Sequence, residues 1–246
     1  PGYTLGVSKG EPSSMYEIVR SQDRYFFQNE WLSAYWHFSF DHYYDPRHVQ
    51  FGPLRVFNND TIQSGAGFPT HSHQEMEIIT YVIDGHLEHK DSTGGIGTIG
   101  PGEVQCMSAG TGIQHSEYNA SQTEEVQLLQ IWILPAVANL DPGYEQKSFT
   151  KEQRQGTLLP IVSGMDHPGA LKIHQDATLY IGRIRTQDKL VFETNSNRQT
   201  YFFVMSGNIE VGEHTLKTGD SSKISEEPVL PLAAQVTSEI LLIDLP

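Results

Sequence analysis

The sequence has little of what several classes of protein require. Its 246 residues include a single cysteine, Cys106, which excludes an intrachain disulfide framework and a cysteine-rich zinc site. We therefore expect a reducing, cytoplasmic setting. The longest apolar runs, such as 128–135, are far shorter than the roughly 20 residues of a membrane helix. No segment has the pattern of a signal peptide, so we predict no membrane association.

Positive charge is also scarce. Sixteen Lys and Arg residues stand against thirty Asp and Glu residues, which gives a formal net charge of −14. Such a chain repels a phosphate backbone unless its few cations are clustered. Direct nucleic-acid binding is therefore disfavoured, whereas the charge permits a protein partner.

Helical periodicity is absent as well. No segment keeps an apolar period of 3.6 residues over three turns, although 148–155 has the composition of a short helix. From residue 51 onward, short apolar or alternating runs are separated by clusters of Gly, Pro, Asn and Asp, which is typical of strands. We predict an all-β chain with strands that include 54–58, 77–83, 103–107, 127–134, 179–184, 199–205 and 239–245.

Two stretches of the chain echo each other. The run YVIDGHLE at 81–88 recurs as FVMSGNIE at 203–210, and GPGE at 100–103 is answered by KTGD at 217–220. Two copies separated by about 120 residues indicate duplicated barrel halves rather than a solenoid, whose repeats are shorter and more numerous. We place the boundary in the Pro- and Gly-containing connector 135–160, which predicts domains at 15–140 and 141–246. Residues 1–14, rich in Gly, Ser and Pro, are interpreted as a tag or disordered leader.

The residues that carry chemistry lie in two short segments of the first half. His71 and His73 are two apart, so a strand would point both imidazoles to one face. His115 and Glu117 repeat this spacing about forty residues later. If the two segments are neighbouring strands, three imidazoles and a carboxylate converge, which suits one first-row transition metal. An open site of the iron(II) type and a closed structural zinc site both fit this ligand set.

These motifs also carry a resemblance. Gly65-x5-His71-x-His73-x3-Glu77-x7-Gly85, together with Gly112-x2-His115-x3-Asn119, resembles the paired motifs of the cupin superfamily. The runs HFSFDHYYDP at 37–46 and MSAGTGI at 107–113 narrow the resemblance to the pirin family of bicupins, from about Tyr16 onward. It implies two tandem cupin β-barrels (double-stranded β-helix or jelly-roll) packed together. It also implies that His71, His73, His115 and Glu117 bind the metal, usually iron, and that Glu77 does not.

The resemblance implies an activity too. Bacterial pirin-like proteins are associated with quercetin 2,3-dioxygenase chemistry, in which O2 opens the heterocycle of a flavonol. The expected cofactor is one divalent metal, iron(II) first, with Mn, Co, Ni, Cu or Zn as alternatives. The expected partners are a small aromatic substrate and O2, and Glu117 is the candidate catalytic base by resemblance to related quercetinases. The alternative is a non-enzymatic, iron-dependent redox-sensing regulatory protein that binds a protein partner.

Several other residues have plainer interpretations. Aligning the two glycine turns places Glu193 and Asn195 where the first half has its histidine pair, and no histidine follows Asp220. We therefore expect the second barrel to lack a metal and to pack against the first. Cys106 is expected to be a buried small hydrophobe. For the others we expect hydrogen-bonding or surface roles: Glu75, Glu77, Asn119 and His174.

Overall fold

The chain forms strands almost throughout. The structure is a computed structural model that describes residues 16–246, so the interpretation of residues 1–14 lies outside the described part. The described residues contain strands β1 to β20 and one short 3-10 turn, η1 (Ser21–Asp23). The all-β prediction is confirmed. Between residues 16 and 246, no helix has the length and hydropathy needed to span a membrane.

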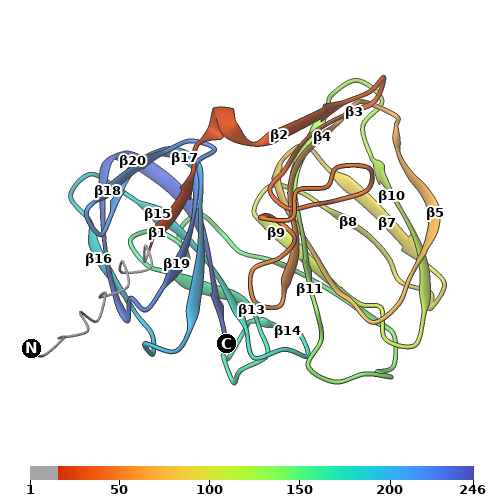
Figure 1. Cartoon of the computed structure of the whole chain (residues 1–246). Coiled ribbons are helices and arrows are strands. Elements are labelled where there is room, and N and C mark those ends of the chain that lie inside the picture. Colours follow the sequence, from red (N-terminus) through yellow and green to blue (C-terminus); the bar gives the residue numbers. More distant parts are fainter. Residues whose placement is uncertain (1–15) are drawn as a thin grey trace, which may run out of the picture.

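Two barrels lie side by side, and the first occupies the right of Figure 1. It is built from a seven-stranded and a four-stranded sheet. In spatial order, the larger sheet contains β12 (Gly143–Ser148), β9 (Glu103–Ser108), β6 (Glu77–Asp84), β11 (Val126–Ile133), β4 (Leu54–Ile62), β3 (Leu32–Trp36) and β2 (Tyr25–Gln28). The smaller sheet contains β5 (Gly67–His73), β10 (Ile113–Asn119), β7 (Leu87–Asp91) and β8 (Ile96–Ile99).

The second barrel is a nine-stranded sheet. Its main path runs through β1 (Tyr16–Val19), β19 (Ser221–Ser225), β17 (Gln199–Val211), β20 (Val229–Leu245), β15 (Thr178–Ile184), β13 (Leu159–Ser163) and β14 (Leu171–Lys172). The long strands β20 and β17 also pair with β16 (Lys189–Glu193) and β18 (His214–Lys217), respectively. All seven strands predicted from the sequence are confirmed, as β4, β6, β9, β11, β15, β17 and β20.

Each barrel includes one strand from the part of the chain that was predicted to form the other barrel. β1 comes first in the described chain yet pairs with β19 of the second barrel. β12 begins at Gly143 but pairs with β9 of the first barrel. β1 and β12 therefore each pair with a strand on the other side of the predicted boundary between 15–140 and 141–246. The division itself stays a prediction.

The short helix predicted at 148–155 is wrong. Ser148 ends β12, and the following residues form a turn. The Thr150 amide donates to Gln153 Oε1 (2.8 Å) and the Gln153 amide donates to Thr150 Oγ1 (3.3 Å). Phe149 and Arg154 on either side are buried, with 4% and 5% exposure. The turn prevails because it buries both of these side chains between the barrels.

The echo in the sequence is a repeat in the backbone. Gly85 and Gly207 have φ of 78° and 105°, and Gly102 and Gly219 have φ of 80° and 83°. All four lie in the left-handed region that favours glycine. A Cβ atom on Gly85 would also lie 2.5 Å from the carbonyl oxygen of Glu125. Left-handed glycines at equivalent positions of the two halves support the duplication.

The hydrophobic core has four clusters. One fills the second barrel, two lie in the first barrel, and the fourth lies between the barrels. The middle cluster joins Phe57 and Tyr81 of the first barrel to Tyr201 and Phe203 of the second. β6 is buried on both faces over most of its length, which explains its continuous apolar run. The larger sheet of the first barrel thus supports the second barrel with one face and lines its own interior with the other.

Candidate metal centre

Strands β5 and β10 bring three imidazoles together inside the first barrel. The strands pair antiparallel with His115 opposite His71 and Ile113 opposite His73. One ring nitrogen from each of His71, His73 and His115 lies within 4.8 Å of the others. The structure therefore assembles the histidine part of the predicted ligand set.

The three histidines fit a divalent transition metal. His71 Nδ1 lies 2.7 Å from the carbonyl oxygen of Pro69, to which it donates, so its Nε2 is the unprotonated nitrogen. His71 Nε2 and His115 Nε2 are 3.0 Å apart. Two nitrogens bound at about 2.1 Å lie about 3.0 Å apart at right angles and about 3.4 Å apart in a tetrahedron. The observed distance is short enough for one ion to contact both nitrogens.

The electrostatics of the cluster favour the ligating form of histidine. Burial, followed by the charge of the nearby His71, lowers the pKa of His73 to about 4. Burial, followed by the neighbouring histidines, lowers the pKa of His115 to about 3. Both imidazoles are therefore neutral at pH 7, and neutral imidazole is the form that binds a metal.

Glu117 lies beside this group rather than within it. The register of β10 shifts between His115 and Glu117, and the Glu117 carboxylate groups with His115 and His89 but not with the other two histidines. Thr80 Oγ1 and Gln105 Nε2 donate to its Oε1 at 3.1 and 2.7 Å. Gln130 Nε2 donates to its Oε2 at 2.9 Å. Its role as a ligand stays a prediction.

Burial sets the protonation of Glu117. Loss of solvent raises the pKa of this carboxyl to about 7, although the three hydrogen bonds act in the opposite direction. The donors come from a polar row across the larger sheet, where Gln130 pairs with Thr80 and Thr80 pairs with Gln105. This row was not identified from the sequence. Its only trace in the sequence is one polar residue at an inward-facing position of each otherwise apolar strand.

His89 is a second residue that the sequence did not reveal. It lies on β7, is fully buried, and its Nε2 donates to Asp91 at 2.8 Å. Its ring stacks on Tyr144 with centroids 4.2 Å apart. The Nδ1 atoms of His89 and His115 are both buried without a partner among the described residues. Because His89 Nε2 donates its proton to the Asp91 carboxylate in a hydrogen bond, His89 Nδ1 is an acceptor that has no donor in the described chain.

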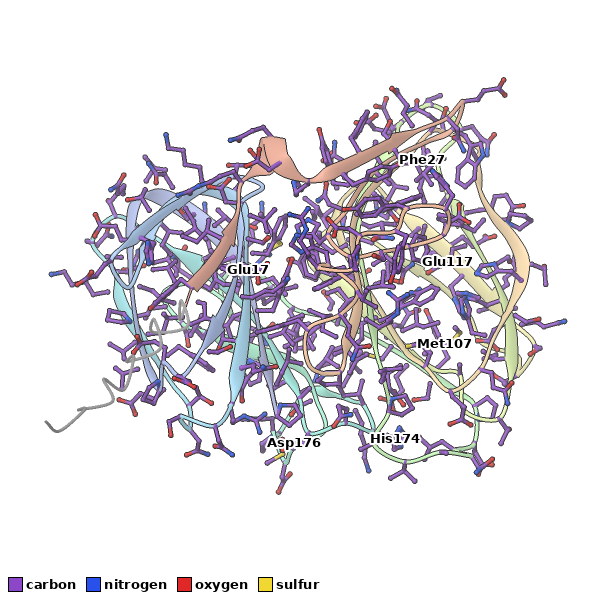
Figure 2. The ribbon with its side chains drawn as sticks, in the orientation of Figure 1. Glu17, Phe27, Met107, Glu117, His174 and Asp176 are labelled. Carbon is purple, nitrogen blue, oxygen red and sulfur yellow. The ribbon has the colours of Figure 1, made fainter. Side chains whose placement is uncertain are left out.

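The histidines open onto a cavity of about 320 Å³, within the range of small-molecule sites. Figure 2 shows Glu117 among the side chains inside the first barrel. The cavity walls are mostly aromatic or aliphatic and come from Leu32, Trp36, Phe40, Phe68, Ile78 and Trp132. The polar lining comes from Asn58, Asp60, His71, His73, His115, Glu117 and Gln130.

The remaining singled-out residues have structural roles. Glu77 is buried, accepts a hydrogen bond from Ser108 (2.7 Å) and pairs with His174 Nδ1 of the second barrel (3.1 Å). Cys106 is buried as predicted, and burial raises the pKa of its thiol well above its usual range. Asn119 braces a turn by donating to the carbonyls of Ile62 and Glu124.

Comparison with known proteins decides the family. Residues 19–133 match the family model described as Pirin, and residues 160–245 match the one described as the quercetinase C-terminal cupin domain. The chain is 40% identical over 232 residues to quercetin 2,3-dioxygenase of Escherichia coli K12, covering 94% of this chain and 99% of that relative. The chain belongs to the pirin family. A pirin-like protein of Caulobacter vibrioides is 39% identical over 87% of this chain and 92% of its own length.

Solved structures agree with the fold of this pirin. The crystal structure of YhhW from Escherichia coli superimposes with a TM-score of 0.91 at 40% identity, covering 94% of this chain and 98% of that one. A second YhhW structure, in complex with nickel(II), has a TM-score of 0.90 at 39% identity, with 94% and 99% coverage. The expected tandem cupin architecture is confirmed.

Proposed function

We propose that this pirin is a metal-dependent dioxygenase that opens the heterocycle of a flavonol such as quercetin with O2. One observation carries the proposal. Three imidazoles and a buried carboxyl meet in an aromatic-lined cavity of about 320 Å³. The relative named quercetin 2,3-dioxygenase supports it, at 40% identity over nearly the whole chain.

The proposed metal ligands are His71, His73 and His115, with Glu117 as the fourth. We propose iron(II) as the working ion. The nickel(II) complex of YhhW supports a divalent metal in this family. We also propose a cytoplasmic location. When bound, such an ion acts as a Lewis acid that lowers the pKa of an oxygen it holds. The aromatic-lined cavity beside the histidines favours this role over a closed structural zinc site.

Glu117 is the proposed base. Its pKa of about 7 lets the carboxyl take a proton from a substrate hydroxyl and return it at neutral pH. The donors Thr80, Gln105 and Gln130 hold the carboxylate in place. These bonds use both lone pairs of Oε1 and one of Oε2, which leaves one site on Oε2 that either a metal or a substrate hydroxyl can take.

The apolar walls position the substrate. Trp36, Phe40 and Trp132 line one cavity with the histidines, and flat ring faces of this kind orient a planar aromatic molecule by stacking and edge contacts. They also exclude water, which strengthens every polar contact inside the cavity.

Oxygen uptake tests the proposal. Protein stripped of metal is reloaded with iron(II), manganese(II), cobalt(II), nickel(II) or zinc(II) in turn and given quercetin in an oxygen-electrode cell. We expect uptake with a redox-active ion and none with zinc(II). Glu117→Gln should keep much of its metal and lose about 10²–10⁴-fold in turnover, the usual contribution of a general base. No uptake with any ion would refute the dioxygenase and favour the redox-sensing regulatory alternative.

A further inference from the structure

Two buried oxygens on β4 have no hydrogen-bond partners in the described chain, and they belong to residues that line the cavity. Asn58 and Asp60 are 2% and 3% exposed, and both line the cavity. They are two apart on one strand, so their side chains lie on the same face of the sheet. Neither Asn58 Oδ1 nor Asp60 Oδ1 has a hydrogen-bond partner among residues 16–246. A buried acceptor without a donor costs free energy, so such pairs are rare unless a ligand completes them.

Other buried polar side chains on this sheet have hydrogen-bond partners within the barrel. Gln130 lies directly opposite Asn58 in the strand pairing. Gln130, Thr80 and Gln105 are also buried, and each is hydrogen-bonded to Glu117. Asn58 and Asp60 on the same sheet take no part in this network. Their free oxygens are therefore a local feature of the cavity.

The cavity lining also contributes an unpartnered donor. Trp132 Nε1 is also buried without a partner in the described chain, and Trp132 lines the same cavity. The surrounding wall is apolar, formed by residues such as Leu32 and Phe40. A ligand that fits this region has a flat apolar body with hydroxyl groups at its edge, because a hydroxyl both donates and accepts.

We propose that Asn58 and Asp60 are specificity-determining residues that form hydrogen bonds with hydroxyl groups of a polyhydroxylated aromatic substrate. This inference rests on the proposed function of the cavity. The two residues lie on the larger sheet, whereas the three histidines lie on the smaller one. In this arrangement the histidines hold the reacting part of the substrate, and Asn58 and Asp60 on β4 bind its other hydroxyl groups.

The test compares two ligands on metal-loaded protein without oxygen. Quercetin and 3-hydroxyflavone share the 3-hydroxy-4-carbonyl group, but 3-hydroxyflavone lacks the remaining hydroxyls. Binding is followed by absorbance titration for the parent protein, Asn58→Leu and Asp60→Leu. Asp60→Asn keeps an acceptor of similar shape. Asn59→Leu is the matched control, because Asn59 lies between the two residues on the opposite face of β4.

We expect Asn58→Leu and Asp60→Leu each to weaken quercetin binding about tenfold, the size of one neutral hydrogen bond. Binding of 3-hydroxyflavone should stay within about twofold, as should quercetin binding to Asp60→Asn and Asn59→Leu. Equal losses for both ligands, no loss for either, or no binding of either to the parent protein would overturn the inference. Bound metal and circular dichroism verify that each variant is folded.

The outcomes separate this inference from the proposed function. If quercetin binds with the expected discrimination but no oxygen is consumed, the dioxygenase proposal fails and the role of Asn58 and Asp60 stands. If oxygen is consumed without any discrimination, the activity stands and the role of these two residues fails.

Discussion

His37 shows how one buried imidazole couples folding to pH. It lies between the barrels with 8% exposure, and its Nδ1 is 2.6 Å from Tyr201 Oη. Its Nε2 faces the guanidinium of Arg24 at 3.4 Å. A guanidinium only donates, so Nε2 is the acceptor and Nδ1 carries the proton. Burial, followed by the charge of Arg24, lowers the pKa of His37 well below its usual range.

The unfolded chain therefore binds a proton on His37 below about pH 6.5 that the folded chain does not bind. The free energy of unfolding should fall as the pH drops, with a contribution from His37 of about 1.4 kcal/mol per pH unit. In His37→Gln, urea unfolding of metal-stripped protein from pH 6.5 to 5 should show a shallower loss by about this amount. The exposed His86→Gln should keep the parent slope. A parental slope in His37→Gln would contradict this assignment.

Residue spacing explains which parts of the site are predictable. The two-residue spacing of His71 and His73 predicts that their side chains lie on one face of a strand, and Gly85 nearby indicates a turn. Asn58, Asp60 and His89 carry no such local signal. Their importance comes from strand pairing between distant segments, such as Gln130 opposite Asn58, which a single sequence does not encode locally.

At the scale of elements, the left-handed glycines permit a controlled comparison. Gly85 and Gly94 have φ of 78° and 95°, but a Cβ on Gly85 would lie 2.8 Å from Val126 Cα, whereas one on Gly94 meets nothing within 4 Å. Gly94→Ala should cost about 1–2 kcal/mol of unfolding free energy for the backbone alone. Gly85→Ala should cost about 1–3 kcal/mol more through crowding. Equal costs in urea unfolding would show that the close approach does not matter.

Strands were predictable where their pattern is local. β6 and β11 are continuous apolar runs between turn residues, and both appear within a residue or two of their predicted ends. The segment 148–155 failed because its fate is set by contacts beyond its own sequence. Phe149 and Arg154 become buried between the barrels, and no helical periodicity competes with that burial.

At the scale of the whole molecule, Arg154 forms contacts with both barrels. It is buried, its Nη1 donates to Tyr81 Oη of the first barrel, and it pairs with Glu239 Oε2 of the second at 3.3 Å. Arg154→Ala should lower the free energy of unfolding by about 1–3 kcal/mol, because the Tyr81 hydroxyl loses its buried partner. The exposed Lys151→Ala should change it by less than about 0.5 kcal/mol.

Two probes of the same urea titrations test whether the barrels unfold together. The three tryptophans, Trp31, Trp36 and Trp132, all lie in the first barrel, whereas far-ultraviolet circular dichroism reports on both. The shared middle layer of the core predicts coincident transitions, shifted equally by Arg154→Ala. Two separate midpoints would show that the barrels are independent.

The most direct test of the account is the amount of metal that the protein holds. Metal-stripped protein is equilibrated with iron(II) under anaerobic conditions, or with nickel(II), passed through a desalting column and analysed by mass spectrometry for bound metal per chain. We expect about one ion per chain in the parent and in the control His86→Ala. His73→Ala and His115→Ala should each fall at least about tenfold in metal affinity, since each removes a ligand. Full metal content in both ligand variants, with parental affinity, would contradict the metal centre on which the proposed function depends.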